Sequence, residues 1–287
     1  SKPQTNISWR ARVAERIATQ RGLGREPPSP AGRLPAHGIA GPQARAGLQC
    51  SSGSKRIGGV DAHPTGTRQK ALALNLDKSK YGTIAEIGAG QEVARWFFLV
   101  GGAAGTVAKS ISAYDMAVSD AIYGQAQRYV SRQRLQAMLE HEFCQLLEGL
   151  GGARGETTTF FAFADTVATR SYTRVDDGRG WIGIRFQRQP LETPSDVIVH
   201  VNLKDATATL QQEALGIIGV NLIYGAYHQH AEPGALIGSL MDDLSRERVE
   251  VDMIKLSGPA FEGVDNRLMS LQLVEQGLTD AAMFTAA

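Results

Sequence analysis

The sequence predicts an α/β or α+β fold, in which a mixed sheet with an antiparallel meander packs against helices. Three observations predict this class. Short β-branched or aromatic segments alternate with longer helical patterns, three such segments follow one another with only turn residues between them, and a strand–helix–strand pattern closes the chain. The closing pattern is typical of a βαβ unit. We therefore expect one globular domain over residues 71–287, preceded by a segment of different character.

The first part of this domain is predicted to contain two strands and two helices. The alternating apolar residues of 71–76 and the apolar segment 83–87 indicate strands, and the second of these leads into a pair of glycines. Residues 91–100 are apolar almost all round and predict a buried helix. Residues 131–152 carry apolar side chains at spacings of three, four and seven, which predict an amphipathic helix. Ser131 suits the N-cap of that helix.

The second part is predicted to begin with the meander. Residues 157–172, 180–187 and 196–203 are rich in β-branched and aromatic side chains, and Asp-Gly and proline turns join them. The pattern beyond them predicts, in order, a long helix, a short helix, a strand, a helix and a closing strand. These elements are expected over residues 208–228, 233–244, 249–256, 265–278 and 281–286.

The charge of the chain is divided between a basic head and an acidic body. Residues 1–70 hold twelve Lys and Arg against three Asp and Glu, a formal charge of +9, so the net charge of +1 leaves −8 for the rest. Residues 7–23 can place apolar side chains on one side of a helix and arginines on the other, which is typical of a transit peptide. We expect an organelle-targeting segment, for a plastid stroma or a mitochondrion. The alternatives are a disordered basic arm or non-native sequence.

The composition argues against several other classes of protein. The longest uncharged apolar runs, Trp96–Ala108 and Ala214–Tyr227, are shorter than the roughly 18 residues of a membrane span. The basic head has few aromatic residues among its arginines and the body is acidic, so no nucleic-acid partner is expected. Cys50 and Cys144 lie in different parts of the chain, so a disulfide framework is not expected.

A glycine-rich region between residues 81 and 115 is the main candidate for ligand binding. Gly88 and Gly90 follow a predicted strand directly, and glycines there let a ligand approach the backbone while the next helix N-terminus favours negative charge. Glu86 precedes them, as an acid does in a dinucleotide or S-adenosylmethionine pocket. The third glycine of the dinucleotide fingerprint would fall at Val93, so that motif is incomplete.

A second glycine cluster follows the predicted buried helix. Gly101, Gly102 and Gly105 could form an anion-binding nest for which Lys109 supplies the positive charge, and Arg95 would add to it. The sequence does not match a phosphate-binding P-loop, because alanines occupy both glycine positions of that motif. The alternative for both clusters is close packing of a buried helix on the sheet.

Two acidic residues are candidates for acid–base chemistry. Asp165 interrupts an apolar strand, and a buried carboxylate is costly unless it is paired or functional. Asp265 follows a strand and opens a helix, where ligands of α/β sheets gather, and its alternative role is the helix N-cap. His228 and His230 form a His-x-His pair that could bind a metal, whereas a solvated helix end is the alternative.

Several long segments of the body, among them "YGTIAEIGAGQEVARWFF", "RYVSRQRLQAMLEHE" and "VDNRLMSLQLVEQGLTDAAMF", carry a dense resemblance to a family of bacterial and algal proteins of unknown function. Automatic names in this family include TonB-dependent receptor and nicotinate or nicotinamide nucleotide adenylyltransferase. The long predicted helices do not fit the first name, and the His-any-Gly-His motif of the second is lacking, so the resemblance implies no catalytic residue. Family members continue past the end of this chain, which fits a fragment.

The function that the sequence favours is a soluble enzyme that binds an anionic, phosphorylated or nucleotide-like small molecule. The ligand is expected at the region from Gly88 to Gly105, with Asp165 or Asp265 as the acid–base candidate. A non-catalytic organellar assembly or scaffold protein, whose glycines serve packing, is the first alternative. A metal-dependent protein that uses the His-x-His pair is the second. The sequence identifies no cofactor.

Overall fold

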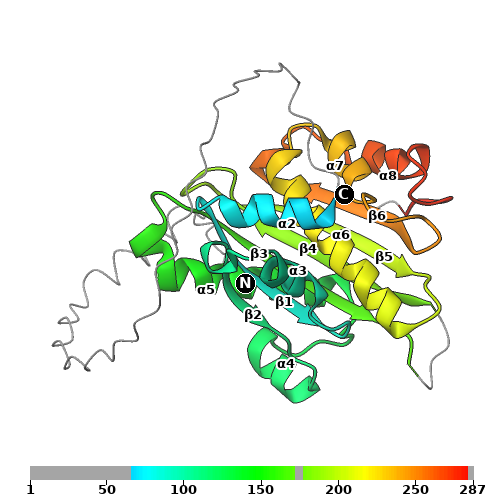
Figure 1. Ribbon diagram of the computed structural model, residues 1–287, viewed down its shortest axis with the longest axis horizontal. Coiled ribbons are helices and arrows are strands. Elements are labelled where there is room, and N and C mark those ends of the chain that lie inside the picture. The colour runs from blue at the N-terminus through cyan, green and yellow to red at the C-terminus, as the bar shows by residue number, and fades with distance from the viewer. Residues whose placement is uncertain (1–65, 172–176, 284–287) are drawn as a thin grey trace, which may run out of the picture.

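The computed structural model describes residues 66–171 and 177–283, which form a six-stranded mixed sheet with helices on both faces (Figure 1). The strand order is β2-β1-β3-β4-β5-β6. β1 is parallel to both of its neighbours, whereas the pairs from β3 to β6 are antiparallel. The expected α/β fold with an antiparallel meander is therefore confirmed. The strands are β1 (Lys80–Ile87), β2 (Val107–Ile111), β3 (Thr159–Ala168), β4 (Gly178–Phe186), β5 (Ser195–Leu203) and β6 (Val249–Ser257).

The helices divide the interior into two hydrophobic cores. α2, α3, α6 and α7 enclose the larger core on one face of the sheet, and α8 packs on β6 at the same core. α5, with α4 beside it, encloses a smaller core on the opposite face. The helices are α2 (Thr67–Leu76), α3 (Glu92–Val100), α4 (Met116–Tyr123), α5 (Arg132–Arg154), α6 (Ala208–His228), α7 (Pro233–Ser239) and α8 (Asn266–Glu275), with short 3-10 turns η1 (Ala103–Gly105) and η2 (Pro259–Phe261).

β3 is buried over almost its whole length because it contributes to both cores. Phe161 and Phe163 lie in the larger core, and Phe160 and Ala162 lie in the smaller one. A strand covered on both faces needs apolar residues at consecutive positions, which accounts for the uninterrupted apolar sequence around them. A charged residue in this strand, such as Asp165, therefore needs a specific reason.

The expected strand over residues 71–76 is wrong, because this segment lies within α2. Its alanines and leucines are strong helix formers, and its short apolar alternation fits a helix as well as a strand. Ala71 and Leu74 are buried at a spacing of three, which is the spacing of a helix face. α2 begins at Thr67, so the expected boundary after residue 70 falls inside a helix.

Most of the other elements agree with the sequence pattern, but β2 and α4 were not expected from it. α3, α5, α6 and β6 form where they were expected, and the Ser131 hydroxyl accepts the amide of Arg134 as the N-cap of α5 (3.1 Å). Residues 281–283 form no strand, and 284–287, which complete the expected closing strand, lie outside the described residues. The expected targeting segment lies mostly in residues 1–65, which are also outside them.

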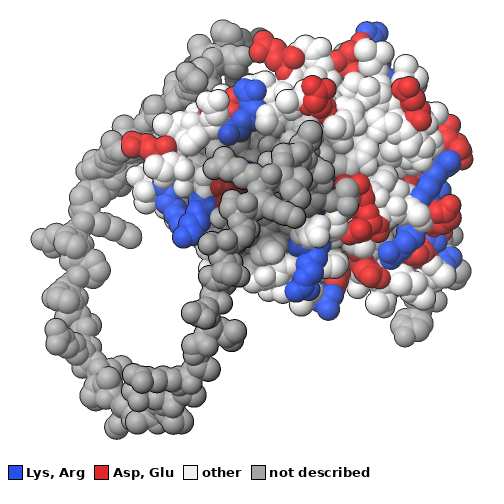
Figure 2. All heavy atoms as spheres, turned by 45° about the horizontal axis from the view of Figure 1, so that its top comes forward, with Lys and Arg blue, Asp and Glu red and all other residues white. Residues whose placement is uncertain are grey.

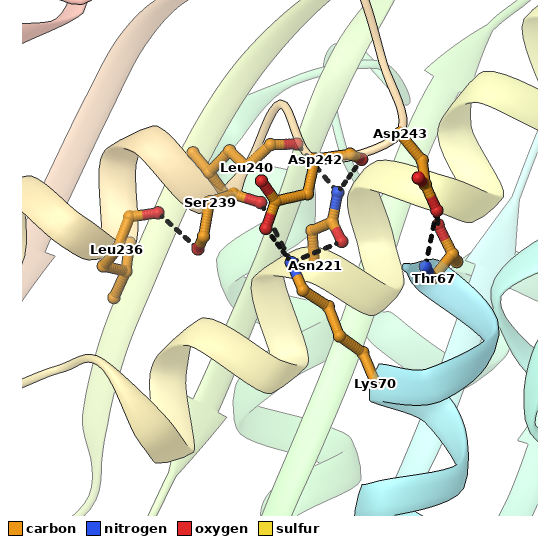
Figure 3. Close-up of polar contacts among 8 residues, drawn as sticks. All are labelled: Thr67, Lys70, Asn221, Leu236, Ser239, Leu240, Asp242 and Asp243. Carbon is orange, nitrogen blue, oxygen red and sulfur yellow. Dashed lines mark hydrogen bonds and ion pairs between the residues drawn. The ribbon is translucent and has the colours of Figure 1, made fainter. Parts of the chain in front are cut away.

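A buried lysine of α2 forms hydrogen bonds with α6, with the end of α7 and with the chain that follows it (Figure 3). Lys70 is fully buried, and its ammonium donates to Asn221 Oδ1 (2.9 Å), to the Ser239 carbonyl (3.2 Å) and to Asp242 Oδ2 (2.6 Å). Burial lowers the pKa of Lys70, and the partner Asp242 opposes this change. The network fixes the helix layer on which α3 rests.

The surface is mixed in charge. On the face drawn in Figure 2, Lys and Arg side chains are interspersed with Asp and Glu side chains among uncharged residues. Over residues 66–171 and 177–283, each helix is too short or too polar to cross a lipid bilayer.

Candidate functional site

The neighbouring strands β1 and β3 lie where the helical connections between strands change from one face of the sheet to the other. From β1 the chain passes through α3, on one face, to β2, and from β2 it passes through α4 and α5, on the other face, to β3. In open α/β sheets, ligands bind beyond the carboxyl ends of the strands at such a point. The candidate site is therefore the edge formed by the ends of β1 and β3 and by the loop into α3.

Glu86, near the end of β1, is fully buried and faces the start of α3. Its carboxylate oxygens accept the amides of Val93 (2.9 Å) and Ala94 (3.0 Å), which belong to the first turn of α3 and favour negative charge. Burial nevertheless raises the pKa of Glu86 to about 7, while the two amides oppose this rise and the charge of Glu92 adds to it. Glu86 therefore changes its protonation state near neutral pH.

Asp165 lies directly opposite Glu86 on the neighbouring strand. It is also fully buried, and its Oδ1 atom accepts the amide of Ile87 (3.1 Å). Among the described residues, no group forms a hydrogen bond with its Oδ2 atom. Burial, and after it the charge of Glu86, raises the pKa of Asp165 well above its ordinary value. Asp165 is therefore a neutral acid at a pH where most carboxyl groups are charged.

The two carboxyl groups can hold and release a proton together. Like charges in one buried site cannot both form easily, so the pair titrates as a unit and keeps one proton to higher pH. A protonated acid beside an ionisable one is the arrangement that general acid–base catalysis uses. The Oδ2 atom of Asp165 leaves one polar position for a ligand or a water molecule to satisfy.

The two glycines of the loop between β1 and α3 have different roles. Gly88 has a φ of 98°, and a Cβ atom there would lie 2.1 Å from the carbonyl oxygen of Val167, so only glycine permits this approach to β3. Gly90 has a φ of 78°, and a Cβ atom there would make only ordinary contact with the side chain of Gln212. Gly88 is thus a packing glycine, whereas the surroundings of Gly90 are more open.

The loop between β1 and α3 carries a run of backbone amides at the start of α3. The Gly90 amide donates to the hydroxyl of Tyr114 (2.8 Å). Within the described chain, no acceptor engages the amides of Gln91 and Glu92, which precede the two amides held by Glu86. Unpaired amides at a helix N-terminus are suited to a phosphate or carboxylate group. The structure therefore brings the expected residues Glu86, Gly88, Gly90 and Asp165 together.

The second glycine cluster lies at the other end of α3. There the side chain of Asn75 donates to the carbonyl of Gly101 (2.7 Å), and Gly102 and Gly105 pack against Asn75. α3 has nine residues, so about 13 Å separates its two ends. These glycines therefore do not share one site with Gly88 and Gly90, and positive φ angles account for Gly101 and Gly102.

Neither of the expected cations forms an ion pair with the carboxyl pair. Lys109 Nζ lies 2.6 Å from Glu142 Oε2 on α5 and donates to Gln145 (2.9 Å). Glu142 is fully buried, so Lys109 neutralises an interior charge. Arg95 is exposed on α3 and pairs with Glu92 (3.2 Å) in the previous turn. Both cations have acidic partners in the chain.

Asp265 is the N-cap of α8, which was its alternative role. Its carboxylate accepts the amide of Arg267 (2.9 Å) and pairs with the guanidinium of the same residue (2.8 Å). The contact with Arg267 lowers the pKa of Asp265 to about 2. Because β6 runs antiparallel to β3, Asp265 lies at the opposite edge of the sheet from Asp165.

The His-x-His pair lies at the end of α6. The ring of His228 stacks on Tyr224 (4.3 Å between centroids), and the ring of His230 lies 6.2 Å from that of Phe186. Across the described ranges, no three His, Cys, Asp or Glu side chains are grouped as a metal site would require. The pair has aromatic neighbours and no third ligand in these ranges.

Two residues of the candidate site were not expected from the sequence. Tyr114 follows β2 and reaches Gly90 across the end of β1, and the Ser112 hydroxyl donates to the Glu86 carbonyl (2.7 Å). Both lie in a loop whose only sequence signal is its position after a strand. A loop beyond the carboxyl end of a parallel strand is a place to look for such residues.

Comparisons with known proteins give little similarity in sequence. No protein-family model matches the chain, and no curated protein matches it. Two solved structures are similar in part. One is the competence/damage inducible protein CihA from Agrobacterium tumefaciens, with 14% identity, a TM-score of 0.38, and coverage of 57% of this chain and 97% of that chain. The other is a competence-damaged protein (CinA) superfamily protein from Enterobacter cloacae, with 10% identity, a TM-score of 0.39, and coverage of 60% and 99%. At these identities and TM-scores, neither structure indicates a function for this chain.

Proposed function

We propose that the protein is an enzyme that performs general acid–base chemistry on a small molecule with an anionic, phosphorylated or nucleotide-like group. The observation that carries this proposal is the pairing of Asp165 with Glu86 at the ends of two parallel strands, with one oxygen of Asp165 unpartnered among the described residues. A buried carboxyl pair is costly for stability, and such pairs are concentrated at functional sites.

Each part of the site has a role in this proposal. The amides of Gln91 and Glu92 bind the anionic group of the ligand, where the N-terminus of α3 favours negative charge. Asp165 faces the reacting group with a proton to donate, and Glu86 accepts or returns the proton as the base. A proton retained by the pair also limits the repulsion between the carboxyl groups and an anionic ligand.

The test is thermal unfolding of the full chain with a panel of inorganic phosphate, pyrophosphate, sugar phosphates, nucleotides, precursors of nicotinamide cofactors and S-adenosylmethionine. A ligand that binds only the native state adds about 2.7 kcal/mol at 100 times its dissociation constant, which raises the unfolding midpoint. Glu92→Pro should abolish this rise, because proline has no amide hydrogen to donate to the ligand. Glu92 is the first residue of α3, a position at which helices tolerate proline well. Glu92→Ala, which keeps the amide, is the matched control.

A second candidate function is a non-catalytic assembly protein, and the packing of the glycines favours it. Gly88 lies against β3, and a Cβ atom at Gly219 of α6 would lie 2.3 Å from the Val93 side chain of α3. In this case the carboxyl pair would only position α3. A folded protein whose midpoint responds to no member of the panel would support this candidate and contradict the proposed enzyme.

A further inference from the structure

Tyr114 combines an exposed ring with an anchored hydroxyl. The residue is 61% exposed, yet its hydroxyl oxygen accepts the Gly90 amide at 2.8 Å. A phenol oxygen on a backbone amide takes the place that a phosphate or carboxylate oxygen of a ligand would take. Three consecutive amides, from Gly90 to Glu92, lead into α3, and the Tyr114 hydroxyl accepts a hydrogen bond from the first of them.

The backbone on both sides of Tyr114 is fixed. Ser112 is held by the Glu86 carbonyl (2.7 Å), and the Asp115 carboxylate accepts the amide of Val118 (3.0 Å) as the N-cap of α4. Ala113, between them, is 3% exposed and belongs to the smaller core. The ring can therefore leave the Gly90 amide by rotating about its own side-chain bonds while the loop remains in place.

We propose that Tyr114 is a gate residue of the anion site, whose hydroxyl holds the Gly90 amide until an oxygen of the ligand replaces it. This inference rests on the proposed function and names the residue that regulates entry to that site. When the Tyr114 ring moves away, one neutral hydrogen bond breaks and little additional surface becomes exposed to solvent, since most of the ring is already exposed. The closed gate lowers the apparent affinity for an anion by the fraction of protein in the open state.

The experiment measures phosphate binding at the amide itself. The full chain is labelled with ¹⁵N-glycine, the Gly90 signal is assigned by its loss in Gly90→Ala, and inorganic phosphate is titrated into the wild type and Tyr114→Phe. Phenylalanine keeps the ring and removes only the hydroxyl. If the hydroxyl competes with the anion, Tyr114→Phe binds phosphate about three- to tenfold more tightly, which is the effect of releasing one neutral hydrogen bond.

Tyr129→Phe is the matched control. Its hydroxyl donates to Asp120 Oδ2 (2.8 Å) and does not contact Gly90, so phosphate affinity should not change. Equal affinity in Tyr114→Phe and the wild type would overturn the gate and leave the anion site in place. Weaker binding in Tyr114→Phe would also overturn it, because the hydroxyl would then be a donor to the ligand. A Gly90 signal that responds to phosphate in neither protein would overturn both the gate and the proposed anion site.

Discussion

Glu86 and Asp165 face each other across two adjacent parallel strands, and both carboxyl groups are fully buried. Two amides of α3 hold Glu86, whereas one oxygen of Asp165 has no partner among the described residues. The two acids therefore differ: the helix positions Glu86, whereas the second oxygen of Asp165 is buried without a hydrogen bond from any described residue.

The stability of the protein should fall as pH rises from about 4 to about 7. Both acids have a raised pKa in the folded state, so the unfolded chain releases their protons first and is favoured as pH increases through this window. For Glu86, the change from 4.5 to about 7 corresponds to on the order of 3 kcal/mol. Urea unfolding at a series of pH values measures the decline. The double variant Glu86→Gln, Asp165→Asn should lose it, and a variant of the exposed Glu275, Glu275→Gln, should keep it.

Phosphate affinity should fall by about tenfold as pH rises through about 7. Glu86 loses its proton in this range, and the new charge lies beside the amides that bind the anion. Titration calorimetry at pH 6 and pH 8 would measure the change, with the charge of phosphate itself taken into account by a sulfate titration. In Glu86→Gln the affinity for sulfate should be independent of pH. A fall of the same size in this variant would show that another group is responsible.

Gly88→Ala should destabilise the protein by about 3 kcal/mol or more, because the new methyl group would overlap the Val167 carbonyl and the backbone φ is positive. Gly102→Ala is the control, since its φ of 78° is also positive but the added atom would make only ordinary contact with Asn75. Its cost should be about 1 kcal/mol. Chemical unfolding compares the two. Equal costs would mean that Gly88 is needed only for its backbone angle.

Lys70→Met should cost about 3 kcal/mol, because Asn221 and Asp242 lose their buried donor (Figure 3). Arg68→Ala, at an exposed position of the same helix, should change stability by no more than about 0.5 kcal/mol. Thermal unfolding of both variants is the measurement. A similar midpoint in the two variants would show that the buried lysine does not fasten α2.

Much of the fold could be predicted because the pattern of apolar residues is strong. The spacing of the leucines in α5 predicts a helix and the apolar run of β3 predicts a strand. Residues 71–76 fit both the helical and the strand periodicity, and they were wrongly predicted to form a strand. Asp165 and Glu86 could be found as acids in apolar strands. Their pairing could not, since it depends on the register between two strands far apart in sequence.

The partners of the remaining candidates depended on the packing of helices. Lys109 next to a serine resembles part of a phosphate site, but its contact is Glu142 on α5, and no local pattern connects the two. Tyr114 gave no signal of its own. It became visible only when the structure placed the loop after β2 beside the loop after β1.

The most direct test is a ¹³C NMR titration of the side-chain carboxyl groups of Asp and Glu, with Glu86→Gln and Asp165→Asn used for assignment. We expect that the signal lost in Glu86→Gln titrates near pH 7 in the wild type, and that Glu86→Gln lowers the midpoint of the Asp165 signal by removing the neighbouring charge. If the signals lost in both variants titrate below about pH 5, as ordinary carboxyl groups do, neither acid holds a proton near neutral pH and the proposed acid–base chemistry is contradicted.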